Sequence, residues 1–418
     1  MADPDDEWDL FGDFDQLGAL PNERGRGEDE RSVLEASGYD RLSDEALVGD
    51  LNLRQREAVL FEDGPLVVVA GAGSWKTRVL TRRIARLVAH GVAPRRILAI
   101  TFTNKAAGEM RERVVELVGD DATKMWVSTF HAACVRILRR NAERVGYRSN
   151  FTIYDDGDSR RLVEHVLDDQ GVDQRRFPPR AVAGAISQAK SELLDPEGYE
   201  NRAGTLYERR IASVYAEYER RLVLANAMDF DDLLVRTVRL LRENPDVLEA
   251  YQERFLHVLV DEYQDTNNAQ NEIVMLLGRG HRNVCVVGDT DQSIYRFRGA
   301  EMRNLLDFEH AFSDAKVIFL EQNYRSSQRI LDAANAVISH NLLRQKKDLW
   351  SSLGDGERIK LFRAGSEREE GGFVADEILS LSRDGGMAFS EIAVFYRTNA
   401  QSRALEQALM ERGVPYKV

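Results

Sequence analysis

A short run of small residues that ends in lysine and threonine is the strongest chemical feature of this 418-residue sequence. It consists of Ala70-Gly71-Ala72-Gly73-Ser74-Trp75-Lys76-Thr77, between an apolar stretch and a segment of helical periodicity. In loops of this kind, backbone N–H groups surround phosphates, the lysine reaches the β- and γ-phosphates and the threonine binds Mg²⁺. We therefore expect a nucleotide-phosphate site here, with Lys76 and Thr77 in those two roles. The alternative is a glycine-rich strand-to-helix turn without a ligand.

One position in this loop departs from the usual pattern. Trp75 stands directly before Lys76, where such loops have glycine. Glycine suits this place because the backbone approaches the ligand closely and adopts torsions that a Cβ atom disfavours. We expect the indole to clash with the phosphates or to rotate the loop, and so to weaken binding.

A second group of residues places carboxylates at the end of an apolar strand. Val258-Leu259-Val260 is followed directly by Asp261 and Glu262. The aspartate can hold Mg²⁺ through water, and the glutamate can orient and deprotonate an attacking water. Together with Lys76 and Thr77, these acids predict a nucleotide-hydrolysing site with Thr77 and Asp261 at the metal. The alternative is a solvated strand end whose two acids are there by chance.

Short apolar segments alternate with helical ones and must position these residues. Strands are predicted at residues 66–70, 97–102, 258–260, 284–287, 317–320 and 392–395, and the phosphate loop opens a helix over 77–88. This alternation predicts an α/β fold with a mainly parallel sheet and ligands at the carboxyl ends of its strands. Between about 140 and 225 the sequence is helical and charged, without strands, as an inserted helical subdomain would be.

The negative charge is concentrated at the start of the chain. Residues 1–50 hold 16 acidic residues and four arginines, a net charge of −12 out of −13 for the whole chain. We expect this leader to be a solvated, disordered tail, or a short protein-binding motif around Trp8, Phe11 and Phe14. The balanced remainder is compatible with a basic groove for nucleic acid.

The composition also bears on where the protein acts. There is no 18-residue apolar stretch, which argues against a membrane span. The acidic start does not resemble a secretion signal, and Cys134 and Cys285 cannot form a disulfide framework. We read both cysteines as small core residues and expect a reducing, cytoplasmic location.

Several longer motifs resemble one family, the UvrD/Rep/PcrA-type superfamily-one (1A) ATP-dependent DNA helicases. The resemblance covers roughly residues 51–418. Its motifs are Leu51-Asn52-Leu53-Arg54-Gln55-Arg56-Glu57-Ala58-Val59, Thr101-Phe102-Thr103-Asn104-Lys105-Ala106-Ala107, Val127-Ser128-Thr129-Phe130-His131, Asp229-Phe230-Asp231-Asp232-Leu233, the stretch from Val287 to Ala300, Leu320-Glu321-Gln322-Asn323-Tyr324-Arg325-Ser326-Ser327, and Tyr396-Arg397-Thr398-Asn399-Ala400-Gln401-Ser402-Arg403.

The resemblance implies a role for particular residues at the nucleotide. Gln55 would read adenine, because a carboxamide both donates and accepts hydrogen bonds. Tyr324 and Arg78 would sandwich the adenine ring. Gln292 would sense the γ-phosphate, and Arg325 would act as an arginine finger.

A further set of residues would contact single-stranded DNA by resemblance. Phe102, Tyr295 and Phe297 would stack on bases, which tolerates any sequence. The remaining members of the set are Thr101, Asn104, His131 and Arg298. Each assignment has an alternative. Phe102 could be a core residue, and His131 could have a structural role. The Tyr-Arg-Phe-Arg run of residues 295–298 could be a solvated loop.

The resemblance implies a P-loop, RecA-like motor domain 1A (51–139 and 225–320), a helical subdomain 1B (140–224) and the first part of a second RecA-like domain 2A (321–418). The implied activity is translocation along single-stranded DNA in the 3′→5′ direction, driven by Mg-ATP, with unwinding at duplex junctions in repair or replication. The family continues beyond this sequence, so we expect impaired activity, with a non-catalytic DNA-binding or regulatory fragment as the alternative. A second alternative, a helicase–nuclease subunit, would need a nuclease site that these residues do not contain.

Overall fold

The computed structural model describes residues 43–294, 301, 303–341 and 344–418. The chain forms two compact units, the first ending at Gly354 and the second comprising Asp355–Val418. The expected boundary between the two motor domains, at residue 320, does not coincide with this division. Residues 321–354 belong to the first unit.

A six-stranded parallel sheet forms the centre of the first unit, with the strand order β3-β2-β6-β7-β1-β8. Its strands are β1 (Leu66–Ala70), β2 (Ile97–Thr101), β3 (Trp126–Thr129), β6 (His257–Val260), β7 (Val284–Gly288) and β8 (Lys316–Leu320). All residues of β1 are buried, because both faces of the strand are covered. Val67 and Val69 join one hydrophobic cluster, whereas Leu66, Val68 and Ala70 join another. The predicted α/β fold with a parallel sheet is confirmed.

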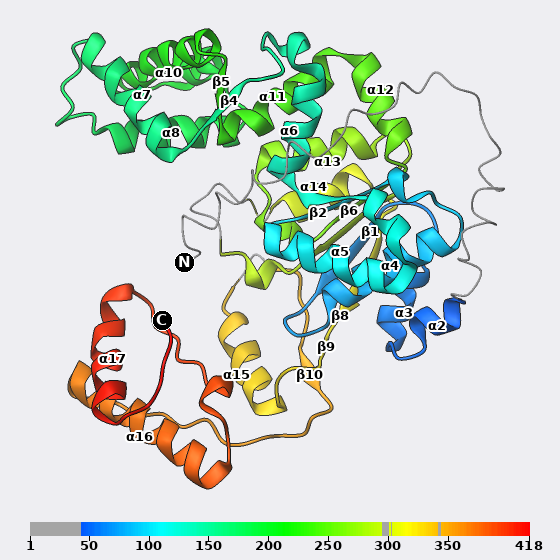
Figure 1. The fold of residues 1–418 in the computed structure, drawn as a ribbon, viewed down its shortest axis with the longest axis vertical. Coiled ribbons are helices and arrows are strands. Elements are labelled where there is room, and N and C mark those ends of the chain that lie inside the picture. Colours follow the sequence, from blue (N-terminus) through cyan, green and yellow to red (C-terminus); the bar gives the residue numbers. More distant parts are fainter. Residues whose placement is uncertain (1–42, 295–300, 302, 342–343) are drawn as a thin grey trace. The chain divides into compact units, whose positions relative to one another are not determined.

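Helices cover both faces of this sheet (Figure 1). One face carries α2 (Asp44–Val48), α3 (Leu53–Leu60), α4 (Lys76–Ala89) and α5 (Asn104–Val118). The other carries α6 (Phe130–Asn141), α11 (Phe230–Glu243), α12 (Pro245–Arg254), α13 (Asn268–Gly278) and α14 (Arg303–Ala311). Cys134 and Cys285 are buried in these two clusters, as expected.

The predicted helical insertion has a hydrophobic cluster of its own. Its helices are α7 (Asp156–Asp169), α8 (Pro179–Ser191), α9 (Pro196–Arg202) and α10 (Leu206–Leu224). The expectation that it lacks strands is wrong in one place. The short β4 (Thr152–Tyr154) pairs in parallel with β5 (Ala227–Asp229), joining the entry to the exit of the insertion.

The last part of the predicted acidic leader is folded. Residues 1–42 lie outside the described part of the chain, but residues 43–50 are folded. Ser43 caps α2, and Leu47 and Val48 are buried against the α4 side of the sheet. Asp44 pairs with Arg86, and Asp50 pairs with Arg82. The acidic composition concealed this helix, because its carboxylates are partners of α4 arginines rather than part of a solvated tail.

After β8 the first unit continues with β9 (Gln322–Asn323), α15 (Gln328–Ile338) and β10 (Trp350–Ser351), and β9 pairs with β10. The second unit packs α16 (Glu367–Gly385) against α17 (Ser402–Glu411). The strand predicted at 392–395 does not form, because no described segment pairs with it to take its backbone hydrogen bonds. Within the described ranges, no helix has the length and apolar character needed to cross a membrane.

Candidate nucleotide-binding site

The predicted chemical residues follow neighbouring strands of one parallel sheet. β6, β7, β1 and β8 are adjacent in that order. The phosphate loop follows β1, Asp261 and Glu262 follow β6, and Asp289 follows β7. Since parallel strands end at the same edge, residues from distant parts of the sequence meet there.

The phosphate loop turns sharply between β1 and α4. Gly73 and Trp75 both have left-handed backbone torsions, with φ values of 65° and 61°. The amide of Ser74 donates to the carbonyl of Gly71 (3.2 Å), which closes the turn. For a residue with a side chain, such a conformation costs on the order of 1–3 kcal/mol. Trp75 therefore occupies a backbone position that glycine would adopt without strain.

The lysine, the threonine and the two acids of the predicted hydrolytic site lie together. The Nζ of Lys76 pairs with the carboxylate of Glu262. The hydroxyl of Thr77 lies beside the carboxylate of Asp261 and lowers the pKa of that acid. Burial, and then the negative charge of Glu262, raise the pKa of Asp261 to about 6. This arrangement brings the predicted phosphate-binding and water-activating groups into one site.

Gln264 joins the acids to the neighbouring strand, a role that sequence reasoning missed. Its Nε2 donates to Glu262 (2.8 Å) and to Asp265 (3.2 Å), while its Oε1 accepts from the amide of Asp289 (2.9 Å). The side chain is buried. The only signal available beforehand was its place three residues after Asp261.

The predicted γ-phosphate sensor lies at the end of β7. Gln292 donates through Nε2 to Asp289. Lys347 is also buried there, with its Nζ 2.5 Å from carboxylate oxygens of both Asp289 and Asp291. No sequence pattern singles out Lys347, because only folding brings Asp289 and Asp291 to it.

The segment after β8 packs on the backbone of the phosphate loop. The Nδ2 of Asn323 donates to the carbonyl of Ala72 (2.6 Å), and the amide of Tyr324 donates to the carbonyl of Gly73 (3.0 Å). A Cβ atom added to Gly73 would lie 2.6 Å from Asn323 and 3.0 Å from the Cβ of Arg325. Arg325 is therefore beside the loop, where an arginine finger is predicted.

The residues predicted to hold adenine surround the same loop, but the indole of Trp75 contacts two of them. Its ring stacks on Tyr324 with centroids 4.1 Å apart and an interplanar angle of 13°. The guanidinium of Arg78 lies over the indole, 4.6 Å from the ring centroid. Gln55 is buried, and its Nε2 donates to the carbonyl of Ser74 (3.0 Å) while its Oε1 accepts from the amide of Asn52 (3.0 Å). Here Gln55 ties α3 to the phosphate loop.

The described part of the predicted DNA set follows β2 and β3. Thr101 is buried and its hydroxyl donates to the carbonyl of Thr103 (3.0 Å), whereas Phe102 is half-buried and Asn104 is exposed. His131 is half-buried and packs edge-on against Phe230, with centroids 5.6 Å apart. Tyr295, Phe297 and Arg298 lie outside the described residues.

The residues of the loop fit a phosphate and Mg²⁺. Within the described chain, the hydroxyl of Ser74 is buried without a hydrogen-bond partner, so a polar group is in place for a ligand. The oxygens of Thr77 and Asp261 are the hard ligands that Mg²⁺ prefers. The described residues contain no cluster of three or more metal-binding side chains.

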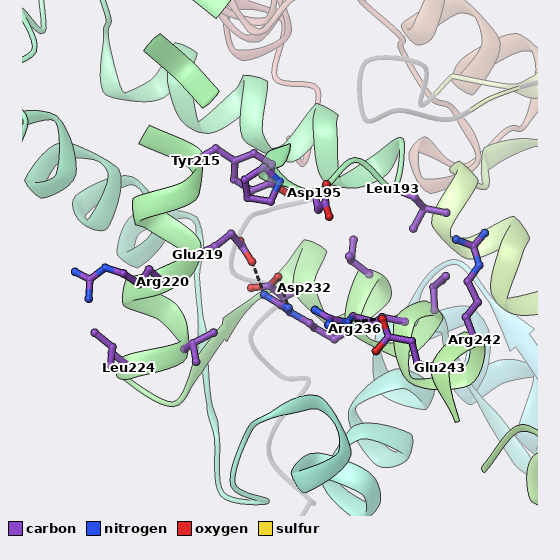
Figure 2. Close-up of a pocket in the computed structure, with 15 residues that line it drawn as sticks. Leu193, Asp195, Tyr215, Glu219, Arg220, Leu224, Asp232, Arg236, Arg242 and Glu243 are labelled. Carbon is purple, nitrogen blue, oxygen red and sulfur yellow. Dashed lines mark hydrogen bonds and ion pairs between the residues drawn. The ribbon is translucent and has the colours of Figure 1, made fainter. Parts of the chain in front are cut away.

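The motif around Asp229 has a structural role that the sequence did not indicate. Asp229 caps α11, and its carboxylate accepts from the buried Lys190 (2.7 Å) and from Tyr218 (2.8 Å). Lys190 also pairs with Asp232 (3.0 Å) and Glu219 (2.6 Å). Glu219, Asp232 and Arg236 lie together at the wall of a cavity of about 680 Å³ (Figure 2). This buried ion cluster joins α8, α10 and α11.

A phosphate loop after the first strand of a parallel sheet, with acids after the next strand but one, is the arrangement of P-loop nucleotide-binding proteins. The UvrD/REP helicase N-terminal domain family matches residues 51–313, and the UvrD-like helicase C-terminal domain family matches residues 318–418. The chain therefore belongs to the UvrD-like helicase family, which confirms the resemblance seen in its motifs.

Curated relatives agree with this assignment. The chain is 54% identical over 386 residues to the ATP-dependent DNA helicase UvrD1 of Mycobacterium tuberculosis, covering 89% of this chain and 50% of that protein. It is 49% identical over 373 residues to the ATP-dependent DNA helicase PcrA of Bacillus subtilis, with shares of 89% and 50%. The chain thus spans about half the length of the curated relatives it matches.

Proposed function

We propose that this chain is the nucleotide-binding and strand-binding part of an ATP-dependent DNA helicase that moves 3′→5′ along single-stranded DNA. The observation that carries the proposal is the meeting of Lys76, Thr77, Asp261 and Glu262 at one edge of the sheet. The relatives named above are ATP-dependent DNA helicases, which supports the same reading. The proposed role in repair or replication rests on the family resemblance, and the proposed cytoplasmic location rests on the composition and the two isolated cysteines.

Each residue has a distinct part in this proposal. Thr77 and Asp261 would hold Mg²⁺, which when bound would neutralise charge on the phosphates. Lys76 would exchange Glu262 for phosphate oxygens, which frees the glutamate to orient a water and accept its proton. Arg325, beside Gly73, would stabilise the charge that develops on the transferred phosphate. Gln292 would respond to the γ-phosphate from its position on Asp289.

DNA would bind near the ends of β2 and β3. Phe102 is half-buried there, and an aromatic ring at this place could stack on a base. Single strands and duplex–single-strand junctions are the proposed substrates, and a protein partner of the acidic leader remains a further proposal.

The test separates nucleotide binding from hydrolysis. ATP hydrolysis is measured with and without oligo(dT), and Mg-ATP binding is measured by calorimetry, for the parent chain, Lys76→Ala and Glu262→Gln. We expect Lys76→Ala to abolish binding, whereas Glu262→Gln should keep it and reduce DNA-stimulated hydrolysis by about 10²–10⁴-fold. Equal hydrolysis in the parent and Glu262→Gln would contradict the catalytic assignment.

A non-catalytic DNA-binding module is the second candidate, and Trp75 in the phosphate loop favours it. This candidate predicts that oligo(dT) binds while no variant hydrolyses ATP. Hydrolysis that is stimulated by DNA and lost in Glu262→Gln would exclude it.

A further inference from the structure

Trp75 occupies a stacking slot that is built for a planar ring. The indole lies nearly parallel to Tyr324 with a centroid distance of 4.1 Å, and Arg78 lies over it at 4.6 Å. An aromatic face together with a guanidinium is a combination that favours flat, electron-rich rings, nucleobases among them. The slot adjoins the phosphate loop, since Trp75 directly precedes Lys76.

The walls of this slot are held in place by other contacts. The hydroxyl of Tyr324 accepts from the Nδ2 of Asn52 (2.9 Å), and the Tyr324 amide is bound to the loop carbonyl of Gly73 (3.0 Å). Arg78 pairs with the carboxylate of Asp50. Because both walls are tied to the loop or to the segment before α3, the slot does not depend on the indole for its existence.

We propose that Trp75 is a specificity-determining residue whose indole fills the place where the base of a purine nucleotide would stack. Indole and purine are both fused five- and six-membered planar rings, so one excludes the other from the face of Tyr324. The chain would then recognise the triphosphate of its ligand with little contribution from the base. This inference rests on the proposed function. Trp75 would weaken recognition of the base, rather than binding of the phosphates as the sequence predicts.

The experiment compares a ligand with a base to one without. Calorimetry measures Mg-ATP and magnesium tripolyphosphate binding to the parent chain, Trp75→Gly and Trp75→Ala. In the parent, we expect the two ligands to bind within about threefold of each other, because no stacking favours ATP. In both variants, the affinity for ATP should rise by roughly 5- to 150-fold relative to the affinity for tripolyphosphate, because the face of Tyr324 is then free to stack on the base.

The two variants and one control separate the possible failures. An unchanged preference between the two ligands in both variants would overturn the inference. So would equal gains for both ligands in Trp75→Gly alone, because the obstacle would then be the backbone torsion rather than the indole. Lys76→Ala reports on the proposed function separately. If it leaves tripolyphosphate binding unchanged, the loop is not the phosphate site, and the inference falls with it.

Discussion

Trp75 combines a strained backbone with favourable ring contacts, and two substitutions separate these effects. Trp75→Gly and Trp75→Ala both remove the indole, but only glycine adopts the φ of 61° without strain. We therefore expect Trp75→Gly to have a free energy of unfolding about 1 kcal/mol greater than that of Trp75→Ala. Urea denaturation of the two variants measures this difference. Equal stabilities would mean that the loop relaxes to another conformation when the indole is removed.

The buried ion cluster makes stability depend on pH. Burial, and then the charge of Asp229, raise the pKa of Asp232 from 3.8 to about 7, while Lys190, Glu219 and Arg236 also face it. An acid whose pKa is higher in the folded state stabilises the protein at low pH, and this stabilisation is lost as the pH rises through the folded value.

Asp232→Asn tests this dependence, because the amide resembles the protonated acid at every pH. The stability of the variant relative to the parent should rise as the pH increases from 3.8 to about 7. Thermal unfolding across that range measures the difference, with the exposed Asp173→Asn as a control for the loss of a carboxylate. A constant difference between Asp232→Asn and the parent would show that Asp232 does not titrate in this range.

At the level of elements, α2 shows how a short acidic helix becomes part of the folded body. Leu47 is 1% exposed and packs in the cluster that covers the α4 side of the sheet. We expect Leu47→Ala to lower the free energy of unfolding by about 2–5 kcal/mol, because a buried leucine is replaced by a cavity. Leu53 is 84% exposed on the neighbouring α3, so Leu53→Ala should change stability by no more than about 0.5 kcal/mol. Chemical denaturation of both variants compares them, and similar losses would contradict the packing of α2.

The phosphate loop is held by elements on both sides of it in sequence. Gln55 on α3 binds the carbonyl of Ser74, and Asn323 and Tyr324 after β8 bind the carbonyls of Ala72 and Gly73. A movement of the segment after β8 would therefore change the hydrogen bonds to the backbone of the phosphate loop.

For the molecule as a whole, the concentration of acidity at one end determines what to expect of DNA binding. The net charge outside residues 1–50 is −1, so these residues carry almost no net negative charge that would repel DNA from a local basic surface. We expect single-stranded DNA to bind without strong sequence preference and with an affinity that falls steeply with salt, because phosphate contacts release counterions. Fluorescence anisotropy with labelled oligo(dT) at several salt concentrations measures this.

Phe102→Ala tests how much base stacking contributes to the affinity for single-stranded DNA. Loss of a stacking ring should weaken binding by about 1–3 kcal/mol at every salt concentration and leave the salt dependence unchanged. Unaltered affinity would show that Phe102 belongs to the core instead.

The sequence by itself determined the parallel α/β fold, the phosphate loop, the paired acids and the family. These features depend on contiguous runs of residues, whose periodicity and order are visible without coordinates. Strand 392–395 was predicted wrongly for the complementary reason, since a strand also requires a partner. The helix at Asp44–Val48 was missed because its acidic composition matches that of a solvated tail.

Tertiary structure alone decided what each of these side chains touches. The contacts concerned join residues far apart in the chain. They are the stack of Trp75 on Tyr324, the hydrogen bond between Gln264 and Asp289, and the ion pairs of the buried Lys190 and Lys347. Such contacts follow from the order of strands in the sheet and from the packing of helices on it. No local pattern encodes them, and for this reason only the folded chain shows that the indole of Trp75 lies between Tyr324 and Arg78.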